Sequence, residues 1–475
     1  MKFKFSKSFF ILGIFILAYT VYFSVLTVMR YKTLYASYYD LGIMHQTVYN
    51  TFRALQIGDF SRFLEMTNTI GPEQIKRMAI HNDILLAFLA PFYFIFSGPA
   101  TLLVIQTVVL ASGALAIFKI GQIVFSKIKE KELLSLVFSL AYLFYPPMQK
   151  ANVFDFHAVT LSTAFLLWMF YFFLKNKFYL SFLFFFLSIF TKEQLPLTTG
   201  FFGAFIIYNG WKNKETKKIR FGIIIAVLSF IWFVLSMSVI IPYFRGSQHF
   251  ALDYYTDLKN PFNVFKYVFR IRTWQYFFLL LGPISFLSLL SPIYLFIALP
   301  EFGINILSRS VNMTNIYYHY TSVITPFIFI SAIYGTRFFC EKTKRVRLII
   351  FLIVVFTTIF AYIKGPLFFS NEKEIHPFLY PQKEIADVEF WAKTLKNENL
   401  KISSTGQLSP FFTSRRYFYT FSKYYDLSDY IIVRINEIYD YPERNELIPV
   451  YEKLVGDKRY ELIYNKDNFK VFKKI

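Results

Sequence analysis

The sequence predicts an all-α, polytopic membrane protein of about eleven transmembrane helices followed by a small α/β domain. Three observations lead to this fold class. Hydrophobic residues make up 55% of the 475 positions and charged residues only 17%, and the mean hydropathy is +0.42. Apolar runs of the roughly 17–25 residues that a bilayer crossing needs recur from residue 9 to about residue 363. Beyond residue 363 they cease, and opposite charges become nearly equal in number.

The net charge of +21 belongs almost entirely to the apolar part of the chain. Residues 1–363 carry 33 Lys and Arg against 14 Asp and Glu, whereas residues 364–475 carry 18 against 16. Basic loops orient transmembrane helices and meet anionic lipid, so we expect membrane lipids and no nucleic acid as partners. Cys340 is the only cysteine, which excludes an intramolecular disulfide and a cysteine-rich metal site.

The first apolar run, about residues 9–29, sets the orientation. It is long and no small-residue cleavage site follows it, so we interpret it as a retained span instead of a signal peptide. The basic clusters at 2–7, 119–131, 212–220 and 342–347 are predicted to be cytosolic. All aspartates of residues 1–363 then fall on the extracytosolic side: Asp40, Asp59, Asp83, Asp155, Asp253 and Asp257.

The run at 84–97 is too short for an ordinary crossing. It has about 14 apolar residues and contains Pro91, which suits a re-entrant or interfacial helix. With this run on the outside, 99–118 crosses inward and delivers the basic cluster 119–131 to the cytosol.

The remaining apolar runs alternate across the bilayer. They are 133–145, 158–174, 178–191, 195–210, 220–242, two crossings around Pro283, Pro292 and Pro300, 321–340 and 348–363. Two long loops, residues 30–80 and 244–273, are predicted to lie on the external side. The sequence therefore predicts a multi-pass plasma-membrane protein with a cytosolic N-terminus and an extracytosolic C-terminal segment.

Residues 364–475 are expected to form a separate α/β domain, outside the transmembrane domain of residues 1–363. A helical pattern at 383–397 precedes strand candidates at 400–404, 416–421 and 430–434, and a hairpin is expected about Lys466-Asp467-Asn468. The segment has neither a Gly-rich phosphate loop nor metal-ligand spacing. We expect it to cover or support a membrane site.

Polar residues gather where the apolar runs end on the predicted outer face. Asp40 follows the first span, His81 and Asp83 precede the run at 84–97, and Lys192-Glu193 ends another span. Each has a plainer interpretation as a helix cap, a solvated side chain or an interfacial ion pair. All six histidines also fall on or near this face: His45, His81, His157, His249, His319 and His376.

Two carboxylates are harder to explain as solvated groups. Asp155 stands between Phe154 and Phe156, where a charge is costly unless it is paired or used. Glu301 lies in an apolar run, where ionisable groups are rare and tend to be functional.

This set of residues suits group transfer. A positioned carboxylate accepts the proton of an attacking hydroxyl, and Asp40 and Asp155 are the candidates. Cations such as Arg77, Lys192 and Arg309 neutralise a leaving phosphate. Asp40, Asp155 and His157 are also candidate ligands for a divalent metal such as Mg or Mn, although their spacing is not diagnostic. The substrate-binding or phosphate-binding candidates are Arg77, His81, His157, Lys192, Glu193, Glu301, Arg309 and His319.

Several ordered motifs resemble a known family. They are YDLGIMHQTVYNT, HNDILLAFLAPFYFIFSGPATLLVIQ, YPPMQKANVFDFHAVTLS, TKEQ, LPEFGINILSRS and YYHYTSVITPF, with a looser echo in ISSTGQLSPFFTSRRYFYTF. Together they resemble an uncharacterised bacterial and archaeal family of predicted multispanning membrane proteins, domain of unknown function 2079. The resemblance covers roughly residues 30–340. That family is usually grouped with the GT-C glycosyltransferases.

The resemblance implies a GT-C-like fold and activity. GT-C enzymes take a sugar from a polyprenyl-phosphate donor at the extracytosolic face, here for an unknown glycan, lipid or protein acceptor. Such enzymes place an essential acid in the first external loop and often another in the next, positions that Asp40 and Asp155 match. The run at 84–97 matches their interfacial helix. Gln194 departs from the family, which usually has an aspartate there, and this puts a role for that position in doubt.

The expected function is therefore an inverting hexosyl or pentosyl transferase with a carboxylate base, Asp40 or Asp155. Lys192 would hold the donor phosphate, and His81 and His157 would orient phosphate or carboxylate groups. One alternative is a transporter or flippase of lipid-linked or envelope glycans, which needs polar residues such as Glu301 and Asn305 along a path. A non-catalytic scaffold for envelope assembly is a third, because Gln194 lacks the carboxylate.

Overall fold

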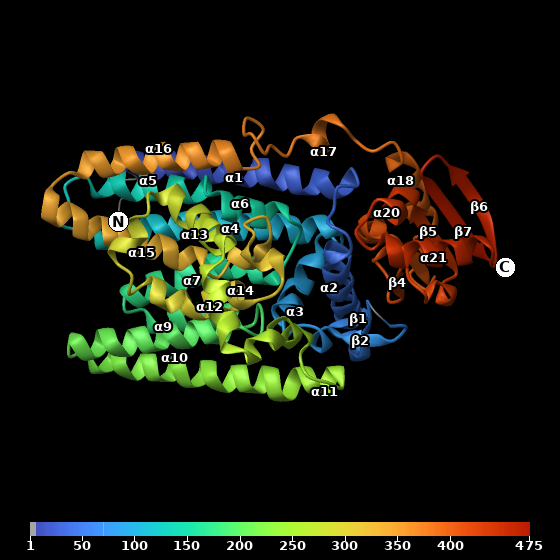
Figure 1. The fold of residues 1–475 in the computed structure, drawn as a ribbon, viewed down its shortest axis with the longest axis horizontal. Helices are drawn as coiled ribbons and strands as arrows, with labels where there is room; N and C mark the ends of the chain where they lie inside the picture. Colours follow the sequence, from blue (N-terminus) through green and yellow to red (C-terminus); the bar gives the residue numbers. More distant parts are fainter. Residues whose placement is uncertain (1–5, 70) are drawn as a thin grey trace.

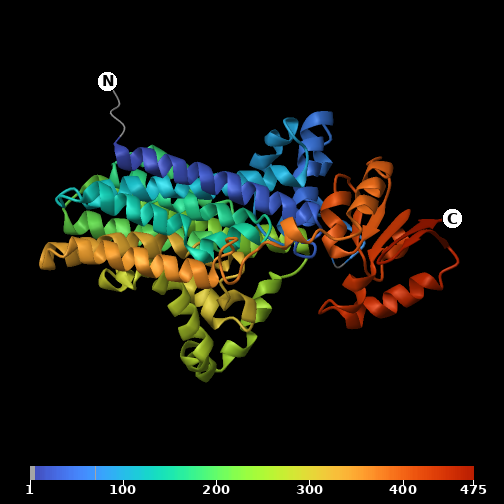
Figure 2. The same ribbon diagram turned by 90° about the horizontal axis from the view of Figure 1, so that it is seen from above.

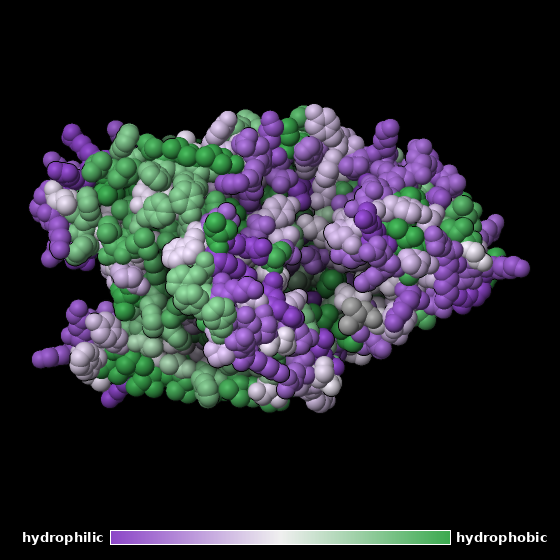
Figure 3. Space-filling view, in the orientation of Figure 1, coloured by the Kyte–Doolittle hydropathy of each residue, from purple (hydrophilic) through white to green (hydrophobic). Residues whose placement is uncertain are grey.

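The computed structural model describes residues 6–69 and 71–475. Long helices from residues 7–364 lie side by side, and a five-stranded sheet lies beyond one end of them (Figure 1). Hydrophobic side chains cover the middle of the helical body, with hydrophilic side chains at both of its ends (Figure 3). This banded surface is what a bilayer-embedded helical bundle requires.

Four helices in the described part of the chain are long and apolar enough to cross a membrane. They are α1 (Lys7–Lys32), α4 (Pro99–Val124), Thr216–Arg245 and α16 (Val346–Lys364). Only 17% of the apolar window of Thr216–Arg245 is buried, against 61% for α4. Because α4 is central and the other helix presents its apolar side chains outward, the outer helix needs lipid around it. The larger number of crossings stays a prediction.

The other predicted runs are helices with nearly the predicted bounds. They are α5 (Lys131–Leu143), α7 (Ala158–Leu174), α8 (Phe178–Ile189), α9 (Leu195–Lys212) and α15 (Thr325–Thr343). The helix Thr216–Arg245 consists of α10 (Thr216–Leu235), a π-helical turn at Ser236–Ile240 and α11 (Ile241–Arg245).

The proline-rich stretch forms broken helices. Between α13 (Ile271–Leu281) and α14 (Leu299–Leu307) the chain makes short 3₁₀ turns, because proline lacks the N–H that a continuous helix needs. Side chains of neighbouring helices satisfy the freed carbonyls: Thr357 Oγ1 donates to Pro283 O at 2.8 Å and Ser331 Oγ donates to Ser288 O at 2.6 Å.

The run at 84–97 contains only a five-residue helix, α3 (Leu85–Leu89), and a 3₁₀ turn at Ala90–Phe94. Ten helical residues would span only about 15 Å, half of the hydrocarbon core. Phe88, Phe92 and Ile95 of this run are exposed. The short length agrees with a run that does not cross.

The helix α2 (Asp40–Ile57) and a hairpin of β1 (Glu65–Thr67) and β2 (Gln74–Lys76) lie at the end of the helical body that is nearer the five-stranded sheet (Figure 1). Other short elements are α6 (Pro146–Val153), a 3₁₀ helix at Phe250–Lys259 and α12 (Pro261–Phe269). The helix α2 is not among the elements predicted from the sequence. The basic α9–α10 and α15–α16 connections lie at the other end (Figure 1).

The C-terminal segment has the predicted strands. The sheet order is β4-β3-β5-β7-β6, with β3 (Ile402–Ser404) parallel to β4 (Phe418–Thr420) and β5 (Tyr430–Arg434). The predicted hairpin is β6 (Tyr460–Lys466) with β7 (Phe469–Lys474). The helices of this segment are α17 (His376–Leu379), α18 (Ile385–Thr394), α19 (Ser409–Phe412), α20 (Ile435–Tyr439) and α21 (Arg444–Val455).

The C-terminal segment packs against the loop that contains α2 (Figure 2). Tyr39 Oη donates to Ser404 O at 2.8 Å and accepts from Phe421 N at 2.9 Å. Ion pairs of Arg53 with Glu398 and of Arg416 with Glu65, at 2.7 and 2.8 Å, flank this contact. The segment therefore supports the helix that begins at Asp40.

Candidate functional site

A cavity of about 520 Å³ opens at the end of the helices where α2 begins. This volume is within the range of small-ligand sites. Its walls come from the first turn of α2, residues 77–83, the start of α7, the α8–α9 turn and residues 249–255 and 312–320. Seven of the predicted site residues line it: Asp40, Arg77, His81, His157, Lys192, Glu193 and His319.

Asp40 is the first residue of α2 and faces the cavity with 43% of its side chain exposed. Its Oδ2 lies 3.7 Å from His157 Nε2. Partial burial raises the pKa of Asp40 to about 6, although the charges of Arg77 and Lys192 oppose the shift. A carboxyl group that titrates close to neutrality can accept a proton from a bound hydroxyl.

Lys192 is a cation that forms no ion pair within residues 6–69 and 71–475. Its Nζ lies 5.8 Å from the centroid of the Tyr320 ring. Arg77 also lines the cavity, but its Nε and Nη2 each donate to the Asp83 carboxylate at 2.9 Å. Both partners of that ion pair are buried. Lys192 is therefore the cation better placed to bind an anion.

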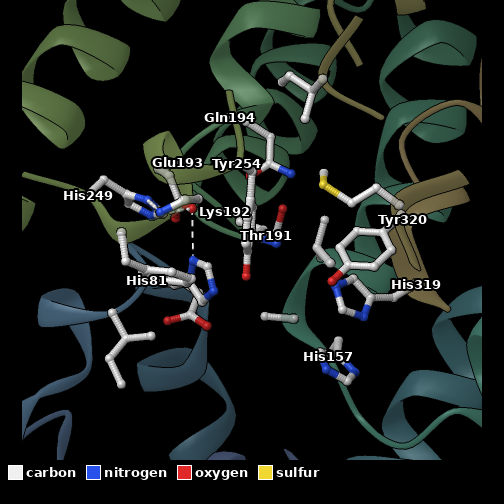
Figure 4. A pocket seen from close by; sticks show the side chains of 18 of the residues that line it. His81, His157, Thr191, Lys192, Glu193, Gln194, His249, Tyr254, His319 and Tyr320 are labelled. Carbon is white, nitrogen blue, oxygen red and sulfur yellow. Dashed lines mark hydrogen bonds and ion pairs between the residues drawn. The ribbon is translucent and has the colours of Figure 1, made fainter. Parts of the chain in front are cut away.

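Glu193 accepts hydrogen bonds at both carboxylate oxygens. Oε1 accepts from His81 Nδ1 at 2.8 Å and from His249 Nε2 at 3.0 Å, and Oε2 accepts from Asn82 N at 3.0 Å (Figure 4). Burial raises the pKa of Glu193, but the two histidines and Lys192 outweigh it and hold that pKa well below its usual range. Glu193 is therefore an ionised carboxylate beside the cavity.

His157 and His319 form an aromatic wall opposite His81 and His249 (Figure 4). Their rings stack with centroids 4.0 Å apart, and Phe154 stacks on the other face of His157 at 5.4 Å. Burial lowers the pKa of His157 to about 3, so its ring is neutral at pH 7. This wall offers flat faces and no positive charge to a ligand.

Asp155 does not line the cavity. Its side chain is buried, and Oδ2 accepts from Ser37 N at 2.8 Å. Burial raises the pKa of Asp155 to about 7, while Arg30 and the hydrogen bond from Ser37 oppose the shift. The residue itself has φ 85°, a conformation that costs energy in a non-glycine residue. In this arrangement Asp155 ties the loop before α7 to the chain that follows α1.

Glu301 and Arg309 also lie outside the cavity lining. Glu301 is buried, and Gln194 Nε2, at the cavity wall, approaches its Oε1 at 3.5 Å. A carboxylate at position 194 would face this acid and repel it, whereas the amide donates to it. Arg309 is exposed and donates to Asp253 O at 2.9 Å.

Of the three predicted metal ligands, Asp40 and His157 lie 3.7 Å apart in the cavity, whereas Asp155 does not line it. In the described part of the chain, the group whose ligand atoms lie within 4.8 Å of one another is His81, Glu193 and His249. His249 lies 56 residues after Glu193, and nothing in the sequence distinguishes it from the other histidines. The contact between His249 and Glu193 is visible only in the tertiary structure.

Nearly the whole chain matches a known protein family. Residues 30–470 match a family described as "Predicted membrane protein (DUF2079)". The chain belongs to this family. The DUF2079 match contains every residue of the cavity lining and almost all of the C-terminal sheet. No curated protein matches the chain. The family description and the four long apolar helices agree that this DUF2079 chain is a membrane protein.

Proposed function

We propose that this DUF2079 protein is a membrane glycosyltransferase of GT-C type. It would move a sugar from a polyprenyl-phosphate donor to an acceptor hydroxyl at the extracytosolic face. The observation that carries the proposal is one cavity at the end of apolar helices that contains both Lys192 and Asp40. Lys192 is a cation without an ion-pair partner among the described residues, 6–69 and 71–475, and Asp40 is a carboxyl group whose pKa is raised to about 6. The usual grouping of this family with the GT-C glycosyltransferases, an analogy of architecture, supports the same reaction class.

Each of these two residues has a role in the transfer. Lys192 binds the donor phosphate and stabilises its growing negative charge as it leaves. Asp40 accepts the proton of the attacking hydroxyl. The acceptor oxygen bonds to the anomeric carbon while the bond from that carbon to the phosphate oxygen breaks, and the phosphate keeps the electron pair. Attack opposite the leaving group inverts the anomeric centre.

The cavity also borders the lipid-facing part of the protein. Phe233 of α10 and Met237 of the π-helical turn contribute to its lining. They belong to the helix Thr216–Arg245, whose apolar window is only 17% buried. A lipid-linked donor could therefore keep its chain in the bilayer while its phosphate reaches Lys192.

The test is the substitution Asp40→Asn, assayed in membranes that contain labelled polyprenyl-phosphate sugar. Loss of a general base lowers a rate by about 10²–10⁴-fold, and we expect a fall in that range. Asp59→Asn is the matched control, because 40% of the Asp59 side chain is exposed, close to the value for Asp40, and Asp59 belongs to no part of the cavity lining. Undiminished transfer by Asp40→Asn would contradict the proposal, as would uptake of the lipid-linked sugar by sealed vesicles without any product.

A further inference from the structure

The hydrogen bonds of His249 determine which of its ring nitrogens carries the proton. The backbone N–H of Ala251 donates to His249 Nδ1 at 3.0 Å. Because an amide N–H can only donate, Nδ1 must present a lone pair. The ring proton is then on Nε2, which points at Glu193 Oε1 from 3.0 Å. His249 is therefore a neutral donor to Glu193.

The ionised Glu193 carboxylate in turn determines the proton position in His81. A carboxylate only accepts, so His81 Nδ1, 2.8 Å from Glu193 Oε1, carries a proton. Burial lowers the pKa of His81, so at pH 7 the ring is neutral and has no second proton. The remaining nitrogen, Nε2, presents its lone pair.

That lone pair faces the cavity. His81 lines the cavity with 20% of its side chain exposed. Figure 4 shows one ring nitrogen of His81 bonded to Glu193 and the other directed toward the cavity. Within residues 6–69 and 71–475, Nε2 forms no hydrogen bond.

The same proton positions argue against a metal ion in this cluster. His81, Glu193 and His249 offer ligand atoms within 4.8 Å of one another. A metal bound to His249 Nε2 would force the ring proton onto Nδ1, where it would meet the N–H of Ala251. Two donors would then face each other, so the donor set does not fit a cation.

We propose that His81 is the residue of this cavity that binds a sugar hydroxyl, with Nε2 as the hydrogen-bond acceptor. Glu193 and His249 are positioning residues that keep its proton on Nδ1. A lone pair repels phosphate oxygens, so the phosphate of the donor belongs at Lys192 and not at His81 Nε2. The sugar as ligand rests on the proposed function, and the inference divides that site into a hydroxyl subsite and a phosphate subsite.

Binding of two probes to the full chain in lipid nanodiscs tests this division. The probes are polyprenyl phosphate and a polyprenyl-phosphate hexose. His81→Phe keeps a ring but removes the acceptor. We expect it to weaken binding of the hexose probe by about threefold to tenfold, the usual effect of one neutral hydrogen bond, and to leave polyprenyl phosphate binding unchanged. Lys192→Met should weaken binding of both probes.

Nitrogen-15 NMR of histidine-labelled protein tests the proton positions without any ligand. The signals lost in His81→Phe identify His81, and we expect a protonated Nδ1 and an unprotonated Nε2. The inference is overturned by a protonated Nε2, by an equal loss or no loss of affinity for both probes, or by stoichiometric Zn²⁺ binding that depends on His249. If wild-type protein binds neither probe, the proposed function fails, while the NMR result still decides the proton position.

Discussion

The cavity cations Arg77 and Lys192 have different surroundings. Arg77 is held by Asp83 in a buried two-pronged ion pair, whereas Lys192 lies near the face of Tyr320 and forms no ion pair with residues 6–69 or 71–475. An arginine already neutralised by a carboxylate contributes little to binding a second anion, and separating the pair would leave a buried charge unpaired. We therefore propose that Lys192, and not Arg77, recognises the phosphate, a distinction that residue type alone does not reveal.

The pKa of Asp40 gives a pH dependence that can be measured. The base must be ionised, and partial burial raises its pKa to about 6. As the pH falls through about 6, Asp40 becomes protonated and kcat/KM should decline; above that pH the ionised form predominates and the rate should level off. Transfer measured from pH 5 to pH 8 checks this, and residual transfer by Asp40→Asn should lack the inflection. A wild-type profile without it would remove Asp40 as the base.

The residue types at the ends of apolar runs made Asp40, His81 and Lys192 predictable, because a water-accessible site must interrupt those runs. Asp155 was predicted on similar grounds but does not line the cavity. Its position between two phenylalanines implied that it is paired or used, and in the structure Ser37 N satisfies its carboxylate away from the cavity. Sequence cannot distinguish a structural partner from a substrate. The role of His249 was invisible for a similar reason, since its partner Glu193 is close only in space.

Among the elements, the straight helices were predictable from their length and apolar composition. Irregular or polar elements such as α2 were not. Residues 158–174 form α7 with the predicted bounds, and the C-terminal strands lie where β-branched and aromatic runs placed them. The helix α2 was missed because its polar residues, such as Gln46 and Asn50, are buried against neighbouring loops. Such a helix lacks both a transmembrane signature and a clean amphipathic pattern.

The contact between α2 and the C-terminal segment can be tested at Gly42. A Cβ on Gly42 would lie 2.7 Å from Ser409 Cβ of α19, so Gly42→Ala must push the two apart. We expect a loss of stability of about 1–3 kcal/mol, measured by thermal unfolding in detergent, together with lower transfer activity. Gly303→Ala is the control: it gains the same helix propensity within α14, and its Cβ would meet nothing within 4 Å. Equal behaviour of both variants would show that this contact does not support the site.

At the scale of the whole molecule, the two ends of the helical body differ in chemistry. The cavity and the C-terminal sheet lie at one end, and the basic α9–α10 and α15–α16 connections lie at the other (Figure 1). From the positive-inside rule we propose that the cavity end faces away from the cytosol. We propose that residues 364–475 act there as an extracytosolic unit that supports α2 and covers the cavity side of residues 1–363.

Sidedness can be measured with single cysteines, because the native Cys340 is buried. Lys129→Cys lies exposed between α4 and α5, and Lys458→Cys lies exposed between α21 and β6. In intact cells an impermeant maleimide should label Lys458→Cys, and it should label Lys129→Cys only after the membrane is permeabilised. The opposite pattern would put the cavity on the cytosolic side and remove the proposed donor.

The most direct measurement is an electron cryo-microscopy structure of the chain in a nanodisc with a bound polyprenyl-phosphate sugar. We predict the phosphate within hydrogen-bonding distance of Lys192 Nζ, a sugar hydroxyl at His81 Nε2 and the face of the anomeric carbon opposite the phosphate open toward Asp40. A donor bound elsewhere, with this cavity empty, would contradict the account.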